Sequence, residues 1–304
     1  MIKIFYTGFV DEAGQSIDVQ IKATKELGWN YIELRNIDGV NITDISQEKF
    51  ENVYNKLANE GIKVNCFGSA VANWAKDPRK DEDFQKSIDE LNRAIPRMKK
   101  MGTKLIRGMS FAILKDVKDN HKLDKEILKK LKYLVDMCKD AKIIYGHENC
   151  MNYFSQSYNH MEQLINIIDS DAFKIIFDTG NPVFSDNRMG KQPYDKQKSW
   201  EVYKLLKDYI YHVHIKDCIY LNETQGIFPN AKYTFPGEGG GCVKKIIKDL
   251  LESGYNRGIS IEPHMTIVFH KQNNNSNNKE LNYKNYIEYG TRLMKLVSTI
   301  KDVI

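Results

Sequence analysis

The stretch Tyr209–Asp217 brings together two histidines and a lysine at alternating positions. In an extended strand every second residue shares a face, so His212, His214 and Lys216 lie together on one side. A solvated edge strand could show this alternation, but two histidines and a lysine are unusual there. The pattern favours a strand that buries one face and lines a polar cavity with the other. The predicted apolar face comprises Tyr211, Val213 and Ile215.

Three neighbouring segments also read as strands that carry an acidic residue at or next to their carboxyl ends. At the catalytic mouth of a parallel barrel, only residues of inward parity near the carboxyl ends of the strands reach the site. Three carboxylates and one imidazole converging there without a cation would repel one another and raise their pKa values. A divalent metal resolves this repulsion, and an oxygen-rich set with one nitrogen favours Mn²⁺, Mg²⁺ or Co²⁺ over Zn²⁺. The alternative is that each acid forms an ion pair inside the barrel. The predicted ligands are Glu148, Asp178, His214 and Glu262.

The same parity rule brings polar residues of the first four strands toward the site. Arg35 and Arg107 could hold substrate hydroxyls, a carboxylate or a phosphate, or they could pair with Glu33 in a structural network. Glu238 could approach the site, or its neighbouring glycines could simply form a tight turn. His147 has the opposite parity and is expected to be a hydrogen-bonded structural residue. The predicted substrate-binding residues are Glu33, Arg35, Ser69, Arg107, Asn181, Lys216, Glu238 and His264.

The elements that must position these residues alternate regularly along the chain. Eight short β-rich runs each precede a longer amphipathic segment, which predicts a (β/α)8 barrel in one domain spanning residues 1–304. A doubly wound open sheet is the main competitor, but no Gly-x-Gly-x-x-Gly follows an early strand. The predicted strands are Ile2–Gly8, Tyr31–Arg35, Lys63–Ser69, Lys104–Met109, Lys142–Asn149, Phe173–Thr179, Tyr209–Asp217 and Gly258–Glu262. The predicted helices are Ile17–Leu27, Ser46–Glu60, Glu82–Met101 with a kink or break at Pro96, Asp124–Asp140, Asn159–Asp169, Trp200–Asp208, Val243–Ser253 and Tyr283–Ile300.

Composition excludes several other classes. The 304 residues carry a net charge of +5 with interleaved signs, which is no nucleic-acid signature. Five cysteines without a Cys-x-x-Cys pair predict free thiols in a reducing compartment. No signal peptide and no apolar run of about 18 residues is seen, so we expect a cytoplasmic protein that does not contact a membrane. The Asn-rich stretch Lys271–Lys279 is interpreted as a solvated insertion, with a mobile lid as the alternative.

At these residues the sequence resembles the xylose isomerase-like TIM-barrel family of sugar and sugar-phosphate isomerases and epimerases. The similarity covers nearly the whole chain, and the order of its motifs is more specific than any one of them. The motifs are Tyr31-Ile-Glu-Leu-Arg35, Gly102-Thr-Lys-Leu-Ile-Arg107, His147-Glu-Asn149, Phe177-Asp-Thr-Gly-Asn181, His212-Val-His-Ile-Lys-Asp217, Pro236-Gly-Glu-Gly239 and Ile261-Glu-Pro-His264.

The resemblance implies a divalent metal on the four predicted ligands, with Glu148 and Glu262 as an acid/base pair. It implies a small carbohydrate substrate and proton transfer through an enediolate. A dehydratase of the inosose or sugar-acid type and an idle sugar-binding homologue are the alternatives. Related abasic-site endonucleases have His where Asn181 stands here, which argues against a nuclease. The sequence leaves open the sugar, its phosphorylation and the oligomeric state, a homo-oligomer included.

Overall fold

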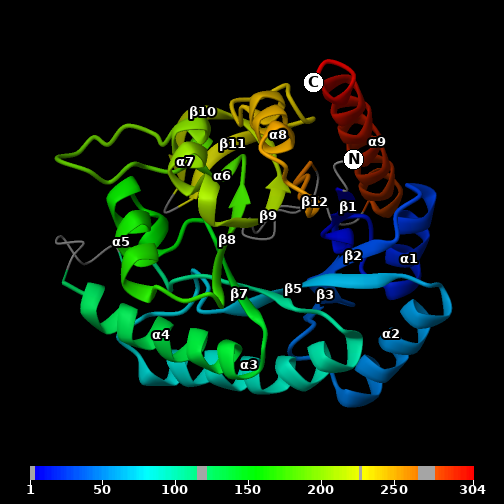
Figure 1. Ribbon diagram of the computed structural model, residues 1–304, viewed down its shortest axis with the longest axis horizontal. Coiled ribbons are helices and arrows are strands. Elements are labelled where there is room, and N and C mark those ends of the chain that lie inside the picture. The colour runs from blue at the N-terminus through cyan, green and yellow to red at the C-terminus, as the bar shows by residue number, and fades with distance from the viewer. Residues whose placement is uncertain (1–3, 115–121, 226–227, 266–277) are drawn as a thin grey trace.

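Eight parallel strands form the centre of the computed structural model, which describes residues 4–114, 122–225, 228–265 and 278–304 (Figure 1). Their order is β1-β12-β9-β8-β7-β6-β5-β2, and an isolated parallel bridge between Phe9 and Glu33 joins the two ends. The predicted (β/α)8 barrel is therefore confirmed. The strands are β1 (Phe5–Gly8), β2 (Tyr31–Leu34), β5 (Lys63–Val71), β6 (Leu105–Gly108), β7 (Ile144–Glu148), β8 (Phe173–Asp178), β9 (Ile210–Ile215) and β12 (Gly258–Ile261).

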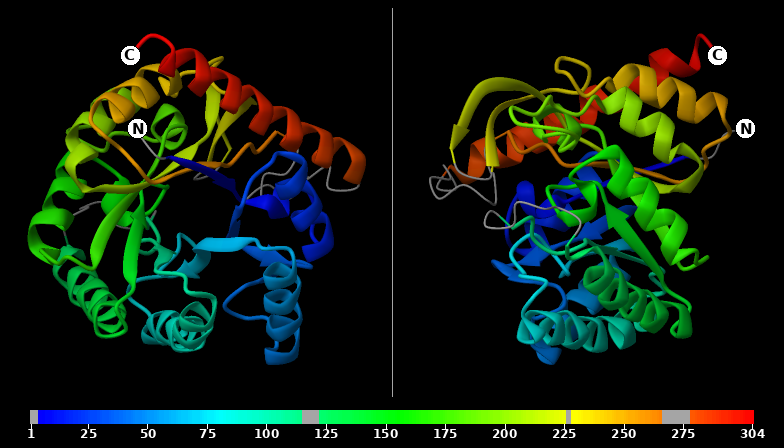
Figure 2. Two further views of the ribbon diagram at one scale, coloured as in Figure 1. Left: turned by 45° about the vertical axis from the view of Figure 1, so that its right-hand side comes forward. Right: turned by 90° about the vertical axis from the view of Figure 1, so that its left-hand side faces the viewer.

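The helices form an outer ring around these strands (Figure 2). Local signals place several of their ends: the Ser46 hydroxyl accepts from the Lys49 amide at a helix start, and Gly102 ends another helix in the left-handed region. Pro96 lies inside a continuous helix, so the predicted break there is wrong. The helices are α1 (Ile17–Glu26), α2 (Gln47–Asn59), α3 (Asp81–Met101), α4 (Asp124–Asp140), α5 (Tyr158–Ile168), α6 (Asn181–Phe184), α7 (Ser199–Leu206), α8 (Val243–Glu252) and α9 (Lys279–Lys301).

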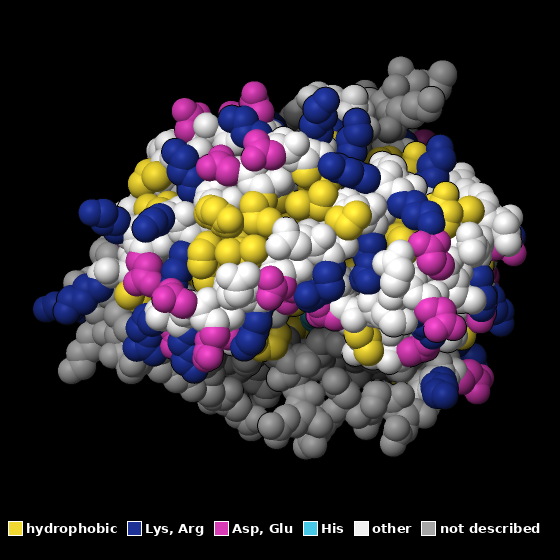
Figure 3. Space-filling view, turned by 90° about the horizontal axis from the view of Figure 1, so that it is seen from below, with side chains coloured by type: hydrophobic (Ala, Val, Ile, Leu, Met, Phe, Trp, Pro, Cys, Tyr) yellow, Lys and Arg dark blue, Asp and Glu magenta, His cyan; other side chains and the backbone are white. Residues whose placement is uncertain are grey.

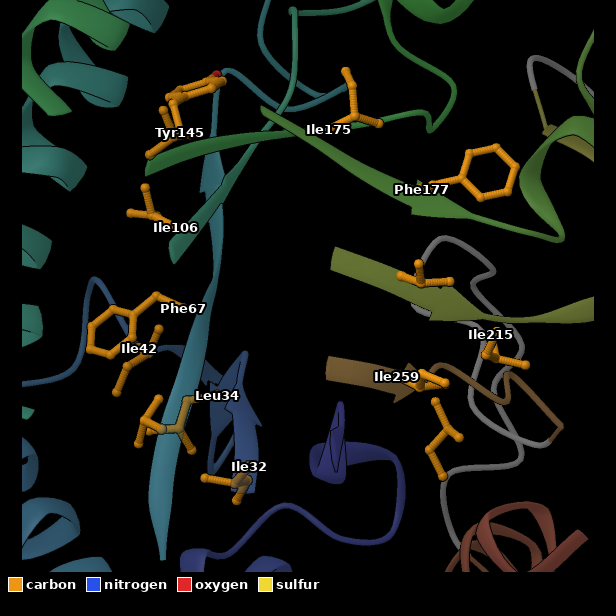
Figure 4. Packing of buried hydrophobic residues seen from close by; sticks show 14 of the residues in the cluster. Ile32, Leu34, Ile42, Phe67, Ile106, Tyr145, Ile175, Phe177, Ile215 and Ile259 are labelled. Atoms are coloured by element: carbon orange, nitrogen blue, oxygen red, sulfur yellow. The ribbon is translucent and has the colours of Figure 1, made fainter. Parts of the chain in front are cut away.

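Apolar side chains divide between the two faces of the barrel wall. Ile32, Phe67 and Ile259 belong to the main core between strands and helices (Figure 4). A smaller cluster of Cys66, Leu105 and Ile176 fills the interior below the polar site. Tyr211 packs against this inner cluster rather than the helix-facing core, which corrects its predicted face. The pairing of β8 with β9 shifts register between Ile175 and Ile176, next to this part of β9.

Two additions to the barrel were not predicted. An antiparallel hairpin of β10 (Asp217–Gln225) and β11 (Phe228–Thr234) follows β9 and projects from the barrel in Figure 2. A smaller pair, β3 (Asn36–Ile37) and β4 (Val40–Asn41), follows β2. Both come after the carboxyl ends of barrel strands, the face on which barrel enzymes build their sites.

The surface that carries α2, α3 and α4 mixes basic and acidic side chains around a strip of apolar ones (Figure 3). Ion pairs such as Lys100 with Glu51 and Arg93 with Asp44 lie on these helices and the loop before α2. This face offers no stripe of one charge for a nucleic acid. Among the described helices, none has the length and apolarity needed to cross a bilayer.

Candidate metal centre and active site

Glu148, Asp178, His214 and Glu262 converge inside the barrel mouth. Glu148 and Asp178 are the last residues of β7 and β8, His214 lies near the end of β9, and Glu262 directly follows β12. All four are buried, and one potential ligand atom from each lies within 4.8 Å of the others. His214 Nδ1 is 3.5 Å from Glu148 Oε1 and 3.6 Å from Glu262 Oε2. The structure thus brings together the four residues predicted as metal ligands.

Two buried atoms of this cluster have no hydrogen-bond partner among the residues that the structure describes. They are His214 Nδ1 and Asp178 Oδ2, and both face the space that the four side chains share. Asp178 Oδ1 accepts from the backbone N–H groups of Gly180 and Asn181, which leaves Oδ2 for another partner. Lys216 Nζ lies 3.0 Å from Oδ2, though not in hydrogen-bond alignment. Orphaned buried polar atoms are rare, so this donor set fits a bound cation.

Glu33 orients His214 from below. The two oxygens of this buried carboxylate lie 3.1 Å from His214 Nε2 and 3.1 Å from His212 Nε2, and one of them accepts from the Ser260 hydroxyl. Because an ionised carboxylate only accepts, Nε2 of His214 carries a proton, and a cation bound in the cluster would leave Nδ1 to offer its lone pair. A carboxylate behind a histidine is a common support for metal ligation. Glu33 therefore positions His214, a predicted ligand, and is not among the residues that line the cavity, which argues against its predicted contact with substrate.

The pKa shifts of Asp178 and His214 show that the cluster favours added positive charge. Burial, with Glu262 and Glu148 nearby, raises the pKa of Asp178 to about 7, although Lys216 opposes the rise. Burial opposes protonation of His214, but Glu33, Glu148 and Glu262 raise its pKa well above the usual range. The predicted upward pKa shift is therefore confirmed for Asp178.

The two glutamates behave differently from this prediction. Burial alone would raise the pKa of Glu148, but Arg107 lowers it below its usual value. Burial likewise opposes ionisation of Glu262, whereas Lys216, His264 and Arg35 hold its pKa well below the usual range. The expected upward shift is wrong for both because residues from other strands supply positive charge.

Arg107 is the partner of Glu148. Its Nη1 lies 3.2 Å from Glu148 Oε2, while its Nε and Nη2 donate to the carbonyl of Ser69. The Ser69 hydroxyl in turn donates to the Arg107 carbonyl. Arg107 lines the cavity, and Ser69 holds Arg107 in place. A substrate contact by Ser69 stays a prediction.

Arg35 is the partner of Glu262. Its guanidinium reaches Glu262 Oε1 at 3.1 Å and also pairs with Asp11 and Glu12, which lie in the 3-10 turn Val10–Glu12 after β1. His264 Nδ1 lies 3.0 Å from Glu12 Oε1. The suggested Arg35–Glu33 pair is wrong, because Glu33 faces the histidines instead. Glu12, Glu262 and His264 form a second acidic group, but Arg35 already supplies its positive charge.

A cavity of about 330 Å³ opens above the cluster. Lys216 Nζ lies 3.1 Å from Glu262 Oε2, and Asn181 Nδ2 donates to Glu148 Oε1 across 3.4 Å. The structure places Trp74, whose location sequence reasoning left open, in the cavity wall. The predicted residues that line the cavity are Arg35, Arg107, Glu148, Asn181, Lys216, Glu262 and His264.

Glu238 does not join this set. Its side chain is 53% exposed and pairs with Arg292 of α9 at 2.9 Å. The adjacent glycines wrap around Asp217, whose carboxylate accepts from the backbone N–H groups of Gly237, Gly239 and Gly241. A Cβ at position 239 would stand 2.4 Å from Asp217 Oδ1, so this close approach requires glycine. The tight-turn interpretation of the Gly-rich segment therefore fits the structure better.

His147 faces away from the site, as its parity predicts. Its Nε2 lies 3.1 Å from both the Ser110 hydroxyl and Asn152 Oδ1, and burial lowers its pKa to about 4. Most of the Asn-rich stretch 271–279 lies outside the described residues, so neither interpretation of it is tested.

Sequence reasoning missed several residues at the site. Asp11 and Glu12 lie beyond the predicted end of the first strand, and their burial next to Arg35 was visible only in the fold. Tyr233 reaches the cavity from the unpredicted hairpin, and its ring meets His264 edge-on with centroids 5.2 Å apart. The further cavity residues are Asn36, Gly39, Asn41, Ala70, Asn73, Met109, Cys150, Met151 and Phe184.

Comparison with known proteins places this architecture in a family. The family described as xylose isomerase-like TIM barrel matches residues 21–287. The chain belongs to the xylose isomerase-like TIM-barrel family.

Similarity to individual proteins is more distant. An inosose dehydratase of Clostridium botulinum (strain Alaska E43 / Type E3) is 28% identical over 137 residues, which span 41% of each protein. The D-psicose 3-epimerase of Clostridium cellulolyticum H10, solved with D-tagatose, has a TM-score of 0.67 at 13% identity, covering 97% of this chain and 99% of that one. A xylose isomerase-like TIM-barrel protein of Mycobacterium smegmatis, solved in complex with magnesium, has a TM-score of 0.63 at 16% identity, covering 95% and 98%. At these identities the solved structures support the fold alone.

Proposed function

We propose that the protein is a divalent-metal-dependent isomerase or epimerase of a sugar or sugar derivative. The observation that carries this proposal is the buried convergence of Glu148, Asp178, His214 and Glu262, with two orphaned atoms facing their shared space. These four residues would hold the cation, and their oxygen-rich chemistry favours Mn²⁺, Mg²⁺ or Co²⁺ over Zn²⁺. The structural relatives named as an epimerase and as a magnesium complex are consistent with it.

The chemistry requires removal of a proton next to a carbonyl, a step too difficult for an unaided carboxylate. A bound divalent cation would supply the positive charge that favours the enediolate over the starting ketone. Glu148 and Glu262 approach the cavity from β7 and β12, so one carboxylate takes the proton and the other, or the same one, returns it. Positioned acid/base groups of this kind contribute roughly 10²–10⁴-fold each.

The surrounding cations keep both glutamates ready to accept that proton. Arg107 pairs with Glu148, whereas Arg35 and Lys216 pair with Glu262. Each pairing stabilises the ionised carboxylate against the cost of burial. Lys216 also faces the cavity, where its ammonium group can hold a substrate oxygen.

Solvent exchange tests the mechanism directly. During turnover in deuterated water, the product should acquire deuterium on carbon at the position where the proton is exchanged. A turning-over enzyme whose product and recovered substrate contain no carbon-bound deuterium would exclude proton transfer through an enediolate. The substrate panel should include ketoses, aldoses and inosose derivatives, and the metal-depleted protein provides the control.

A second candidate is dehydration of an inosose or a sugar acid, favoured by the curated relatives named inosose dehydratase. The same residues would remove the proton, and water would then leave from the neighbouring carbon. Product mass separates the two reactions because isomerisation leaves it unchanged and dehydration lowers it by one water.

A further inference from the structure

The outer part of the cavity differs in character from its floor. The floor carries the carboxylates and cations described above, whereas the outer wall includes Asn36 from β3, Asn73 and Trp74 from the loop after β5, and Tyr233 from β11. None of these four side chains carries a charge at neutral pH. What this wall can bind bears on the substrate class, and the inference rests on the proposed function.

The permanent cations that line the described cavity are already matched by carboxylates. Arg35 contacts Asp11, Glu12 and Glu262, and its Nε lies 2.9 Å from Asp11 Oδ2. Arg107 contacts Glu148 at 3.2 Å, and Lys216 contacts Asp178 and Glu262 at 3.0 and 3.1 Å.

These contacts pair three cations with five carboxylates. One bound divalent cation would make the number of positive charges equal to the number of negative charges. A phosphate group carries about −1.5 to −2 charges at pH 7. The described part of the cavity therefore holds no surplus positive charge for a phosphate, and desolvating one there would be costly.

The outer wall instead offers uncharged hydrogen-bonding atoms. Asn36 Nδ2 donates to Asp11, and Asn73 Oδ1 accepts from the Ala75 amide. Their other amide atoms, Asn36 Oδ1 and Asn73 Nδ2, form no hydrogen bond with any described residue, and the same holds for the Tyr233 hydroxyl. One acceptor, one donor and one group that can do either are well matched to sugar hydroxyls, which both donate and accept.

We propose that the site takes an uncharged sugar or cyclic polyol and discriminates against its phosphorylated form. The reacting end faces the glutamates, and the distal hydroxyls bind Asn36, Asn73 and Tyr233. The selectivity arises from two effects: the hydroxyls satisfy neutral polar atoms, and a phosphate at the distal end would meet uncharged wall residues above a floor without spare positive charge.

A matched substrate panel tests this proposal on the metal-loaded protein. Each uncharged ketose is compared with its phosphorylated counterpart, by turnover and by calorimetric binding, with inorganic phosphate as a competitor. We expect kcat/KM to favour the uncharged member by at least about 100-fold, and millimolar phosphate to leave turnover unchanged. A phosphorylated sugar that binds or reacts better than its uncharged form would overturn the inference while leaving the proposed reaction intact. Failure of every sugar to bind or exchange deuterium would overturn both.

Charge insertion at the outer wall provides the sharper test. Asn73→Lys should raise kcat/KM for phosphorylated relative to uncharged substrates by about tenfold, the effect of one favourable charge contact. Asn59→Lys, which adds the same charge at an exposed site at the end of α2, should leave this ratio unchanged. Tyr233→Phe should raise KM for the uncharged substrate with its fold and thermal unfolding temperature intact. An unchanged ratio in Asn73→Lys, together with an unchanged KM in Tyr233→Phe, would overturn the assignment of this wall.

Discussion

The two halves of the barrel supply opposite kinds of chemistry. The residues that could hold a cation lie at or next to the carboxyl ends of β7, β8, β9 and β12. The strands β2 and β6, with the turn after β1, contribute the long cationic side chains and the acids that steady them. Arg107 and Arg35 reach across to Glu148 and Glu262, so each half neutralises part of the other.

This difference shows how the barrel keeps its acids ionised although they are buried. Burial works against charge on Glu148 and Glu262, yet both pKa values lie below the usual one. Among the three acids of the cluster, Asp178, whose Oδ2 lacks a hydrogen bond with the described residues, is the one whose pKa is raised. Lys216 and the two arginines thus supply positive charge to these acids, and the proposed cation would add to it.

Removal of the metal should have the largest effect on this balance. Dialysis against a chelator should abolish turnover and lower the unfolding temperature, and Mn²⁺ should restore both. At a metal concentration 100 times Kd the stabilisation is about 2.7 kcal/mol. Elemental analysis, thermal unfolding and calorimetry measure these effects, with Asp178→Asn as the variant expected to lose affinity. A purified sample that contains no metal and binds no Mn²⁺ would favour the idle sugar-binding alternative.

Glu148→Gln and Glu262→Gln should come next, because each amide keeps the shape of the side chain but cannot accept the proton. We expect roughly 10²–10⁴-fold lower kcat for each, with circular dichroism unchanged. Glu238→Gln is the matched control, since that side chain is exposed and paired with Arg292. Comparable loss in the control, or retained activity in either variant, would contradict the assignment of the two glutamates.

Arg107→Met tests the contribution of the first half. The change removes the guanidinium beside Glu148 and leaves the carbonyl of Ser69 without its donors. Charged hydrogen bonds are worth about 1.5–3 kcal/mol, so kcat/KM should fall roughly tenfold or more. Arg93→Met, which removes an arginine that pairs with Asp44 away from the cavity, controls for loss of charge. Equal kinetics in the two variants would show that the halves act independently.

Asp217→Asn should have a smaller effect, on stability and substrate affinity rather than on the chemical step. One amide cannot replace a carboxylate that accepts from Cys218, Gly237, Gly239 and Gly241. We expect about 1–3 kcal/mol lower unfolding free energy, measured by urea denaturation. KM should rise and kcat should change little, because the hairpin begins at this residue. A lowered kcat with KM unchanged would instead assign Asp217 to the reaction.

Sequence alone could predict the second half of the site because its logic is local. Each strand is short, and parity decides which side chain points inward at its end, as for Glu148 and Asp178. The first half depends instead on long side chains that contact residues of other segments. Arg35 extends to Asp11 and Glu12, and no periodicity in the sequence indicates that a turn after β1 returns beneath that guanidinium. Glu238 was misplaced for the converse reason, since the glycines beside it fold around Asp217 and turn its side chain toward Arg292.

The hairpin was missed because its strands do not belong to the barrel alternation. Cys218 and Ala231 pack with Met151 and Phe184, whereas Ile219 and Leu221 are exposed, so apolar residues occupy both faces and the sequence shows no alternation. Tyr233 reaches the cavity only through the register of β10 with β11, which pairs it with Cys218.

The anchoring of this hairpin has a consequence for how the protein could diversify. Asp217 holds the Gly-rich segment and begins β10, while Lys216, one residue earlier, faces the carboxylates. Tyr220 and Ala231 pair within the β10–β11 hairpin. An insertion or deletion in the hairpin between these two residues would leave the anchors in place. Variation there would leave the residues proposed for proton transfer in place, so the hairpin and this site can vary separately.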